Sequence, residues 1–251
     1  MENFVGVMDS GVGGLTVLRE LACVAPQCNF VYVADHAFCP YGTKTFEEIK
    51  SRVVDVARHL ANSGASGIVV ACNTASVFAR EIAESTALPV FDVITPTCKS
   101  AAQMSKSKRI AVLATDATVK SKVYQNTLLQ QGMEVVALPC SSFVPLVEQC
   151  APETEISKTV SATLCNVSCA NCDVVILGCT HFPFLQKHIQ KHVGNAQILS
   201  CAIPVAESFS ENCLCKLGSG KRTFFTTGAP VAASRAARPF GDIEFAHIDI
   251  V

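Results

Sequence analysis

Residues 68–76 read I-V-V-A-C-N-T-A-S, an apolar run that ends in a cysteine followed by an amide and a hydroxyl side chain. Residues 174–181 read V-V-I-L-G-C-T-H and repeat this order in the second half of the chain. Runs that are apolar throughout are typical of strands covered on both faces, as in parallel sheets. A helical stretch follows each run, so the two segments predict matching strand–helix units in an α/β protein.

Short apolar runs alternate with helical stretches along the rest of the chain as well. The expected strands are Val5–Met8, Phe30–Ala34, Ile68–Ala71, Val90–Val93, Ile110–Ala114, Val135–Leu138, Val174–Leu177, Ile198–Leu199, Thr223–Thr226 and Ile243–Ala246. The expected helices are Leu15–Cys23, Phe46–Asn62, Ser76–Ser85, Ala117–Gln131, Thr154–Cys165 and Phe184–His192. Strand followed by helix, repeated in this way, predicts βαβ units and a mostly parallel sheet.

The two halves predict two similar α/β domains, each a mostly parallel sheet of about five strands flanked by helices. The first domain is expected to hold residues 1–94 and 205–251, and the second residues 95–204. The chain would cross between the domains beside Pro96 and Pro204. Because ligands of such folds bind beyond the carboxyl ends of strands, the active site is expected in the crevice between the domains.

The bulk composition favours a compact soluble protein. Of the 251 residues, 49% are hydrophobic and 16% are charged, which argues against a disordered chain. The formal net charge is -1 and no basic patch stands out, which argues against nucleic acid as a partner. The N-terminus lacks the pattern of a secretory signal, and no apolar run approaches the ~18 residues of a membrane span. We therefore expect a cytoplasmic protein with no membrane partner.

Cysteine is frequent, with 14 residues in the chain. In a reducing compartment, most of these thiols should be free and buried as small apolar side chains. A disulfide between Cys72 and Cys179 is disfavoured in that setting. Each of these two cysteines nevertheless differs from the others, because each directly follows a strand and directly precedes polar residues and a helix.

The cysteine spacing also raises the question of a metal site. Cys179 and His181 are separated by one residue, which is not the spacing of a standard zinc pair. The run Cys165-x3-Cys169-x2-Cys172 has a spacing that can ligate an iron–sulfur cluster or zinc. It lies at an expected helix end before a strand, unlike the loop that such clusters use. We therefore predict no metal, and the cluster reading remains an alternative.

Polar residues crowd the carboxyl ends of the expected strands. They are Asp9, Ser10, Pro40, Tyr41, Gly42, Cys72, Asn73, Thr74, Thr115, Asp116, Thr118, Glu148, Cys179, Thr180 and His181. This mixture of hydroxyl, amide, carboxylate, imidazole and thiol groups suits a small polar ligand with carboxylate and amino groups. The N-termini of the following helices favour its anionic parts.

A glycine-rich segment, D-S-G-V-G-G-L at residues 9–15, resembles a phosphate loop only superficially. It lacks the Lys-Ser/Thr ending of a nucleotide loop and the third glycine of a dinucleotide fingerprint. We expect Gly11, Gly13 and Gly14 to form a tight turn from strand to helix, with Asp9 and Ser10 facing the crevice.

The two cysteines at strand ends suggest paired acid–base chemistry. Helix N–H groups near such a thiol lower its pKa from a reference of ~8.5. If the domains face each other, Cys72 and Cys179 would flank one ligand from opposite sides. One thiol could then remove a proton from a carbon while the other delivers a proton to the opposite face. The product is the mirror-image configuration, and the reaction needs neither a metal nor a redox cofactor.

Several segments closely resemble the signature segments of bacterial glutamate racemases. They are D-S-G-V-G-G-L (9–15), C-P-Y-G (39–42), A-C-N-T-A-S (71–76), F-V-P-L-V-E (143–148), G-C-T-H-F-P (178–183) and F-F-T-T-G (224–228). The resemblance implies interconversion of L- and D-glutamate by two cysteines without pyridoxal phosphate or another cofactor. It also implies that D-glutamate feeds peptidoglycan, and that the protein is a homodimer.

The resemblance further implies a role for each site residue. Cys72 would act on the Cα proton of the D-isomer and Cys179 on that of the L-isomer. Asp9 would assist Cys72, whereas Glu148 and His181 would assist Cys179. The substrate would be held by Asp9, Ser10, Pro40, Tyr41, Gly42, Asn73, Thr74, Thr118, Thr180 and His181.

Two segments depart from the family pattern, and other functions stay open as alternatives. Lys122 stands where the family usually has glycine, and Leu199-Ser200-Cys201 replaces a segment like Val-Asp-Ser. The alternatives are a racemase for aspartate or a hydantoin, a non-catalytic protein that binds a partner on the same scaffold, and the metal protein considered above.

Overall fold

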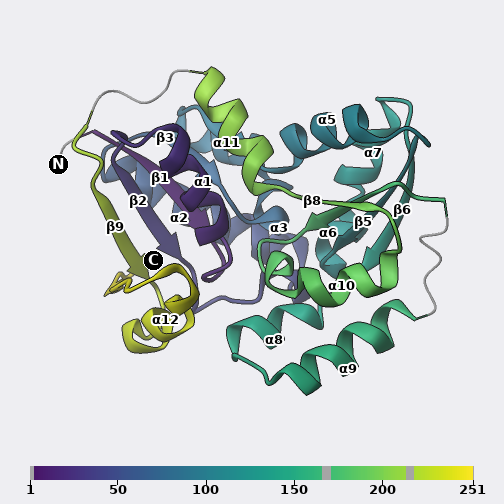
Figure 1. The fold of residues 1–251 in the computed structure, drawn as a ribbon. Helices are drawn as coiled ribbons and strands as arrows, with labels where there is room; N and C mark the ends of the chain where they lie inside the picture. The colour runs from purple at the N-terminus through teal and green to yellow at the C-terminus, as the bar shows by residue number, and fades with distance from the viewer. Residues whose placement is uncertain (1–2, 166–170, 213–217, 251) are drawn as a thin grey trace.

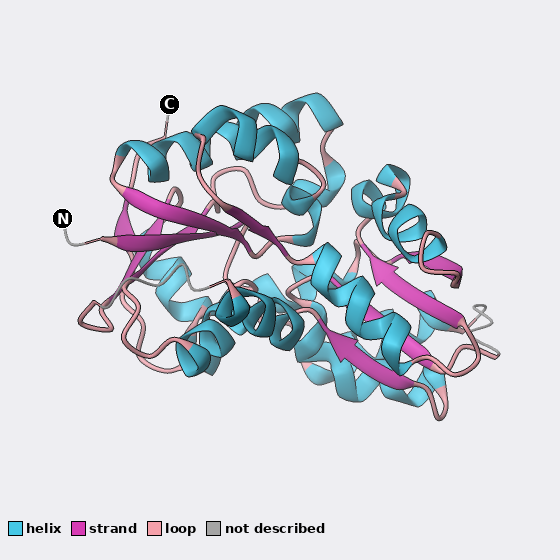
Figure 2. Cartoon of the chain, turned by 90° about the horizontal axis from the view of Figure 1, so that it is seen from above, coloured by secondary structure: helices cyan, strands magenta, loops and turns pink. Residues whose placement is uncertain are grey.

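The computed structural model describes residues 3–165, 171–212 and 218–250. Its strands form two parallel sheets that lie side by side, each with helices on its faces (Figures 1 and 2). This arrangement confirms the expected α/β class. The first sheet has six strands and the second has four. The expectation of about five strands in each half is therefore wrong.

The first sheet has the strand order β10-β9-β2-β1-β3-β4. Its strands are β1 (Phe4–Asp9), β2 (Phe30–Ala34), β3 (Ala65–Val70), β4 (Val90–Asp92), β9 (Arg222–Thr226) and β10 (Ala246–His247). In the parallel register, Asp9 lies opposite Ala34, and Met8 lies opposite Val70. The residues that follow β1, β2 and β3 therefore emerge together at one edge of the sheet.

The second sheet has the strand order β6-β5-β7-β8. Its strands are β5 (Arg109–Ala114), β6 (Glu134–Pro139), β7 (Val174–Gly178) and β8 (Gln197–Ser200). Ala114 lies opposite Gly178, so Thr115 and Cys179 follow neighbouring strand ends. The carboxyl ends of the central strands thus carry the polar residues in both sheets.

Helices cover both sheets. The α-helices are α1 (Leu15–Val24), α2 (Phe46–Asn62), α3 (Asn73–Ser76), α4 (Ala79–Thr86), α5 (Ile94–Met104), α6 (Asp116–Ser121), α7 (Val123–Leu129), α8 (Phe143–Glu148), α9 (Glu153–Leu164), α10 (Gln186–Val193), α11 (Ala202–Glu211) and α12 (Pro230–Ala236). The 3-10 helices are η1 (Tyr41–Thr43), η2 (Phe182–Leu185) and η3 (Arg238–Phe240). Among the described residues, no helix combines the length and the apolar character that a membrane span requires.

Two helices, α5 and α11, lie where the chain passes from one sheet to the other. The sequence patterns predict neither, because Pro96 and Pro204 suggest breaks at these places. Each proline lies in the first turn of its helix, where a missing backbone N–H costs no helical hydrogen bond. Since α11 packs against both α1 and α5, the crossings form a helical layer beside both sheets (Figure 1).

The hydrophobic core is continuous across the two sheets. One cluster contains Val7 of β1, Val112 of β5 and Ile176 of β7, together with Phe209 of α11. A second cluster covers the other face of the first sheet under α2, and a third covers the other face of the second sheet under α8 to α10. Burial of a shared core holds the two sheets in a fixed relation, which a site built from both of them needs.

Three element boundaries differ from the sequence prediction. The expected helix 117–131 is two helices separated by Lys122, whose φ of 59° is the left-handed conformation that favours glycine. The expected helix 76–85 is likewise interrupted between α3 and α4. The last strand is Ala246–His247 and begins later than the apolar run at Ile243 suggests. The left-handed conformation at Lys122 is one that glycine adopts with less strain than lysine.

Candidate active site

Cys72 lies at the end of the first sheet, directly before α3, and its side chain is buried. Its Sγ lies 3.9 Å from Ser10 Oγ. Burial and the charge of Asp9 raise the pKa of Cys72 well above its usual value, and a backbone hydrogen bond from Ala75 only partly opposes this shift. The N–H of Ala75 therefore lowers this pKa as expected, but burial outweighs it and the expected net lowering is wrong. Since α3 has only four residues, it supplies too little compensation.

Cys179 occupies the corresponding place after β7 of the second sheet and is also buried. Its Sγ lies 3.6 Å from His181 Nδ1, and His181 Nε2 contacts Glu148 Oε1. Burial lowers the pKa of His181, but its contacts with Cys179 and Glu148 outweigh burial and raise this pKa well above its usual value. Cys179 thus lies beside an imidazole whose pKa is raised.

Glu148 ends α8 and turns its carboxylate toward both sheets. Besides His181, its Oε1 accepts a hydrogen bond of 3.2 Å from the backbone N–H of Val12. Burial opposes ionisation of Glu148, but the contacts from His181 and His36 outweigh it and hold its pKa well below the usual range. Glu148 therefore carries a negative charge at the junction of the two halves.

Asp9 joins the two halves from the other side. It accepts a hydrogen bond from the backbone N–H of Gly14 at 3.1 Å and from Thr180 Oγ1, which lies 3.1 Å from each of its oxygens. Burial raises the pKa of Asp9 from 3.8 to about 6, and the nearby charge of His181 only partly lowers it. A carboxyl with this pKa can change its protonation state within the neutral range.

The glycines of residues 9–15 serve close approach more than turn formation. None of Gly11, Gly13 and Gly14 has a positive φ. A Cβ at Gly11 would overlap the Glu148 carboxylate, and a Cβ at Gly13 would lie 2.6 Å from Thr180 Oγ1. The missing side chains therefore let residues of the second sheet reach the end of β1, in addition to forming the expected turn between β1 and α1.

Three threonine hydroxyls form a cluster between the halves. Thr74 Oγ1 lies 2.9 Å from Thr115 Oγ1 and 3.1 Å from Thr118 Oγ1, and the latter two are 2.9 Å apart. Thr115 Oγ1 also accepts a hydrogen bond from the backbone N–H of Thr118, and hydroxyls of this kind can rotate to donate to a carboxylate. Thr74 and Thr118 were expected as substrate residues. Thr115 was noted only at its strand end, and its N-cap position before α6 was the available signal.

Asn73 is held between the two sheets by both ends of its amide. Its Oδ1 accepts a hydrogen bond of 2.6 Å from the hydroxyl of Tyr124, and its Nδ2 lies 3.6 Å from Cys201 Sγ. Cys201 belongs to one of the two segments that depart from the family pattern. That departure therefore contacts a predicted substrate residue, although it contacts neither Cys72 nor Cys179 in this way.

Tyr41 lies in the turn that begins with Pro40, and its hydroxyl is already occupied. It donates a hydrogen bond of 2.7 Å to Asp35, whose carboxylate also pairs with the Arg52 guanidinium at 2.7 Å. The side chain of Tyr41 therefore anchors the turn, while Gly42 lies against Thr115.

The positions of the cysteines bear on the disulfide and metal-site alternatives. Cys72 and Cys179 are free thiols. Within residues 3–165, 171–212 and 218–250, no three His, Cys, Asp or Glu side chains are grouped so as to hold a metal ion. Cys165 is exposed and Cys172 is buried, whereas Cys169 lies outside the described residues.

Comparison with known proteins finds a consistent set of relatives. Residues 5–207 match the family model of Asp/Glu/Hydantoin racemase. A glutamate racemase of Aquifex aeolicus is 39% identical over 208 residues, which cover 82% of each chain. A glutamate racemase isoform of Bacillus anthracis has a TM-score of 0.92 at 30% identity, covering 99% of this chain and 98% of that one. The Francisella tularensis glutamate racemase, solved with D-glutamate, has a TM-score of 0.88 at 28% identity, covering 99% and 97%.

Proposed function

The chain belongs to the Asp/Glu/Hydantoin racemase family and is an amino-acid racemase, and on this premise we propose that it interconverts L- and D-glutamate. The reaction moves a proton at Cα between two cysteines and uses no cofactor. The observation that carries the proposal is the matched position of Cys72 and Cys179 at the strand ends of the two sheets. Both thiols are buried, and each directly precedes the polar residues that follow its strand.

The surroundings of the two thiols assign the first step from L-glutamate. Cys179 beside the His181 imidazolium takes the Cα proton as a thiolate, and Cys72, held protonated by burial, delivers its proton to the opposite face. Asp9 would assist Cys72, and Glu148 would assist Cys179 through His181. In the reverse direction the same groups exchange roles.

Substrate recognition in this proposal uses neutral donors. The hydroxyls of Thr74, Thr115 and Thr118 and the amide of Asn73 would hold the carboxylates, while Asp9 would receive the ammonium group. Backbone N–H groups of the turn at Gly42 would complete the carboxylate site. Because the Cα–H is a very weak acid, donors fixed around the developing negative charge in a closed, water-poor site supply the stabilisation that the reaction needs.

We further propose a wider setting for this reaction. We place the domain boundaries at residues 94–95 and 204–205, and the active site between the domains. D-glutamate from this reaction would supply peptidoglycan synthesis in the cytoplasm. The expected homodimer stays a prediction, which light scattering on the purified protein tests.

Circular dichroism of L-glutamate incubated with the purified protein tests the activity. The signal should decay to zero without added cofactor, whereas the double variant Cys72→Ser/Cys179→Ser should leave it unchanged and so control for a contaminating racemase. Aspartate and a hydantoin should react far more slowly than glutamate. An unchanged L-glutamate signal with the intact protein would reject the proposed substrate, and faster aspartate turnover would assign the neighbouring activity.

A further inference from the structure

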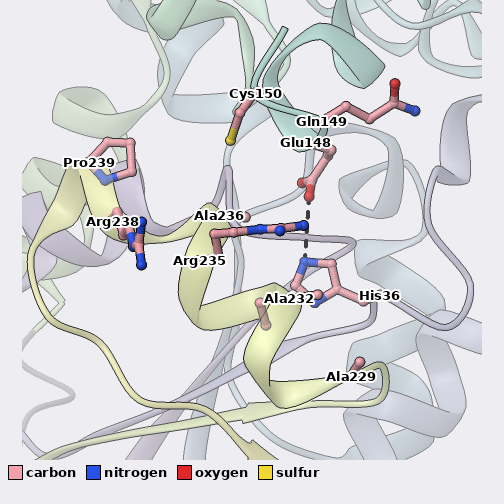
Figure 3. Close-up of a pocket in the computed structure, with 11 residues that line it drawn as sticks. His36, Glu148, Gln149, Cys150, Ala229, Ala232, Arg235, Ala236, Arg238 and Pro239 are labelled. Carbon is pink, nitrogen blue, oxygen red and sulfur yellow. Dashed lines mark ion pairs between the residues drawn. The ribbon is translucent and has the colours of Figure 1, made fainter.

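His36 follows β2 and contacts the carboxylate behind the second thiol. Its Nε2 lies 3.5 Å from Glu148 Oε2, and its Nδ1 lies 2.8 Å from Thr226 Oγ1. Figure 3 shows the imidazole facing the Glu148 carboxylate across the wall of a pocket, with the two joined by a dashed line. Sequence reasoning gave His36 no role, because its partner lies far along the chain.

The two oxygens of Glu148 have different partners. Oε1 faces His181 and the backbone N–H of Val12, both inside the site. Oε2 faces His36, on the side of the pocket. The carboxylate therefore bridges two imidazoles, and a chain of contacts runs from Cys179 through His181 and Glu148 to His36.

We propose that His36 is a positioning residue of the racemase, which holds Glu148 so that Glu148 in turn holds His181 against Cys179. This inference rests on the proposed function and extends it to a residue that does not touch the substrate. Because an ionised carboxylate only accepts hydrogen bonds, the Nε2 that faces it carries the proton. His36 thus presents a donor to the outer oxygen of Glu148 and keeps the inner oxygen free for His181.

Thr226 and Gly228, at the end of β9 in the first sheet, hold the imidazole of His36 in place. Thr226 Oγ1 accepts a hydrogen bond of 3.1 Å from the backbone N–H of Gly228, which orients its hydroxyl toward His36 Nδ1. A Cβ at Gly228 would lie 2.7 Å from His36 Cβ, so the glycine provides the space for the ring. The F-F-T-T-G segment, which the proposed reaction leaves without a role, therefore serves to position His36.

The burial of Nε2 shows that the Glu148 contact is its main interaction. The atom is buried, and the described part of the chain offers it no hydrogen bond of normal length. A polar atom buried in this way is costly unless a nearby charge compensates it. Glu148 supplies that charge, and the imidazole in turn helps to hold the pKa of Glu148 below its usual range.

The pH dependence of activity follows from the groups around Glu148. These are His181 after β7, His36 and Tyr32 from β2 and its loop, Cys39, Asp9 after β1, and Arg235 and Arg238 across the pocket. Loss of His36 removes one of the two contacts that lower the pKa of Glu148, so this pKa rises. Glu148 is then protonated at higher pH, so the loss of kcat/KM relative to the parent should grow as the pH falls.

The pocket allows a direct rescue experiment. It has a volume of about 770 Å³ and is lined by His36, Glu148 and the small residues of one face of α12 (Figure 3). Free imidazole is much smaller than this space, so it can reach Glu148 from outside when the side chain of residue 36 is removed.

Variants at position 36 separate the two ring contacts. The amide nitrogen of His36→Gln reaches the place of Nε2 and faces Glu148, whereas that of His36→Asn reaches the place of Nδ1 and faces Thr226. His36→Ala should lower kcat/KM about tenfold, as expected for the loss of a close polar contact with a buried charged group, and should shift the acid limb upward. His36→Gln should restore most of the lost kcat/KM and most of the acid limb of the parent. His36→Asn should resemble His36→Ala.

Added imidazole should restore His36→Gly toward the activity and acid limb of the parent, and thermal unfolding shows whether each variant is folded. Equal behaviour of the Gln and Asn variants, or a pH profile identical to the parent in all of them, would overturn the inference. Absence of racemisation by the intact protein would instead overturn the proposed function, so the two failures are distinguishable.

Discussion

Cys72 follows β3 of the first sheet and Cys179 follows β7 of the second, each at the carboxyl end of a central strand. Their surroundings differ in charge. Cys72 lies beside Asp9 and Ser10, so burial and a neighbouring carboxyl favour the neutral thiol. Cys179 lies beside His181, which Glu148 and His36 support from behind.

This difference shows that two matching strand ends can have different surroundings. Burial and Asp9 favour the neutral thiol at Cys72, whereas the neighbour of Cys179 is an imidazole whose pKa is raised. Under the proposed function, Cys72 would deliver the proton in the reaction from L-glutamate and Cys179 would accept it.

The largest expected effect comes from removing either thiol. Cys72→Ser and Cys179→Ser should each lower kcat/KM for both isomers by at least about a thousandfold, because a hydroxyl is a much weaker acid than a thiol. Cys23→Ser, at an exposed cysteine of α1, is the matched control and should leave the rate unchanged. Retention of activity in either site variant would break the comparison, since one thiol would then suffice.

A smaller loss is expected when only the charge beside Cys179 is removed. His181→Gln keeps a polar side chain but cannot become a cation, so it should lower kcat/KM about a hundredfold. Because the equilibrium constant of a racemisation is one, kcat/KM must fall equally for L- and D-glutamate. Initial rates with both isomers check this. An unchanged rate would show that the imidazolium is not what distinguishes Cys179 from Cys72.

The smallest expected effect is a change in stability when Asp9 is replaced. Its folded-state pKa of about 6 is above the usual 3.8, so ionisation of Asp9 destabilises the folded protein as pH rises between these values. Asp9→Asn should therefore raise the free energy of unfolding near neutral pH by at most about 3 kcal/mol. The gain should be much smaller in acid, where the folded protein keeps Asp9 protonated.

Urea unfolding of the parent and Asp9→Asn at the two pH values measures this difference, and kcat/KM measured in parallel should fall. A variant that is no more stable near neutral pH would show that Asp9 is not strained by its ionisation. Asp9 would then contribute less to the difference between the surroundings of Cys72 and Cys179 than the burial of Asp9 indicates.

Much of the site could be predicted from sequence because strand ends in parallel sheets fall at one edge. The residues around Cys72 and Cys179 follow apolar runs that predict strands directly, and the structure places them together. His36 could not be predicted, since its role depends on a contact with Glu148 from a different sheet. Helices α5 and α11 were missed for a local reason, because Pro96 and Pro204 disguise helix first turns as breaks.

The expectation for the Cys72 thiol failed for a physical reason as well. A helix start lowers the pKa of a thiol only when its N–H groups outweigh burial, and the balance between the two terms depends on packing that no local pattern encodes. The position of Asp9 relative to Cys72, set by the pairing of β1 with β3, added a further opposing charge.

Racemisation of L-glutamate in deuterium oxide tests most directly whether two thiols act from opposite faces of one carbon. Mass spectrometry of each isomer at early times should find deuterium at Cα of the D-glutamate formed, while the remaining L-glutamate keeps its protium. This result requires that one group removes the proton and another, already exchanged with solvent, delivers the deuteron. D-glutamate that retains protium, or L-glutamate that gains deuterium as fast as the product forms, would contradict the account.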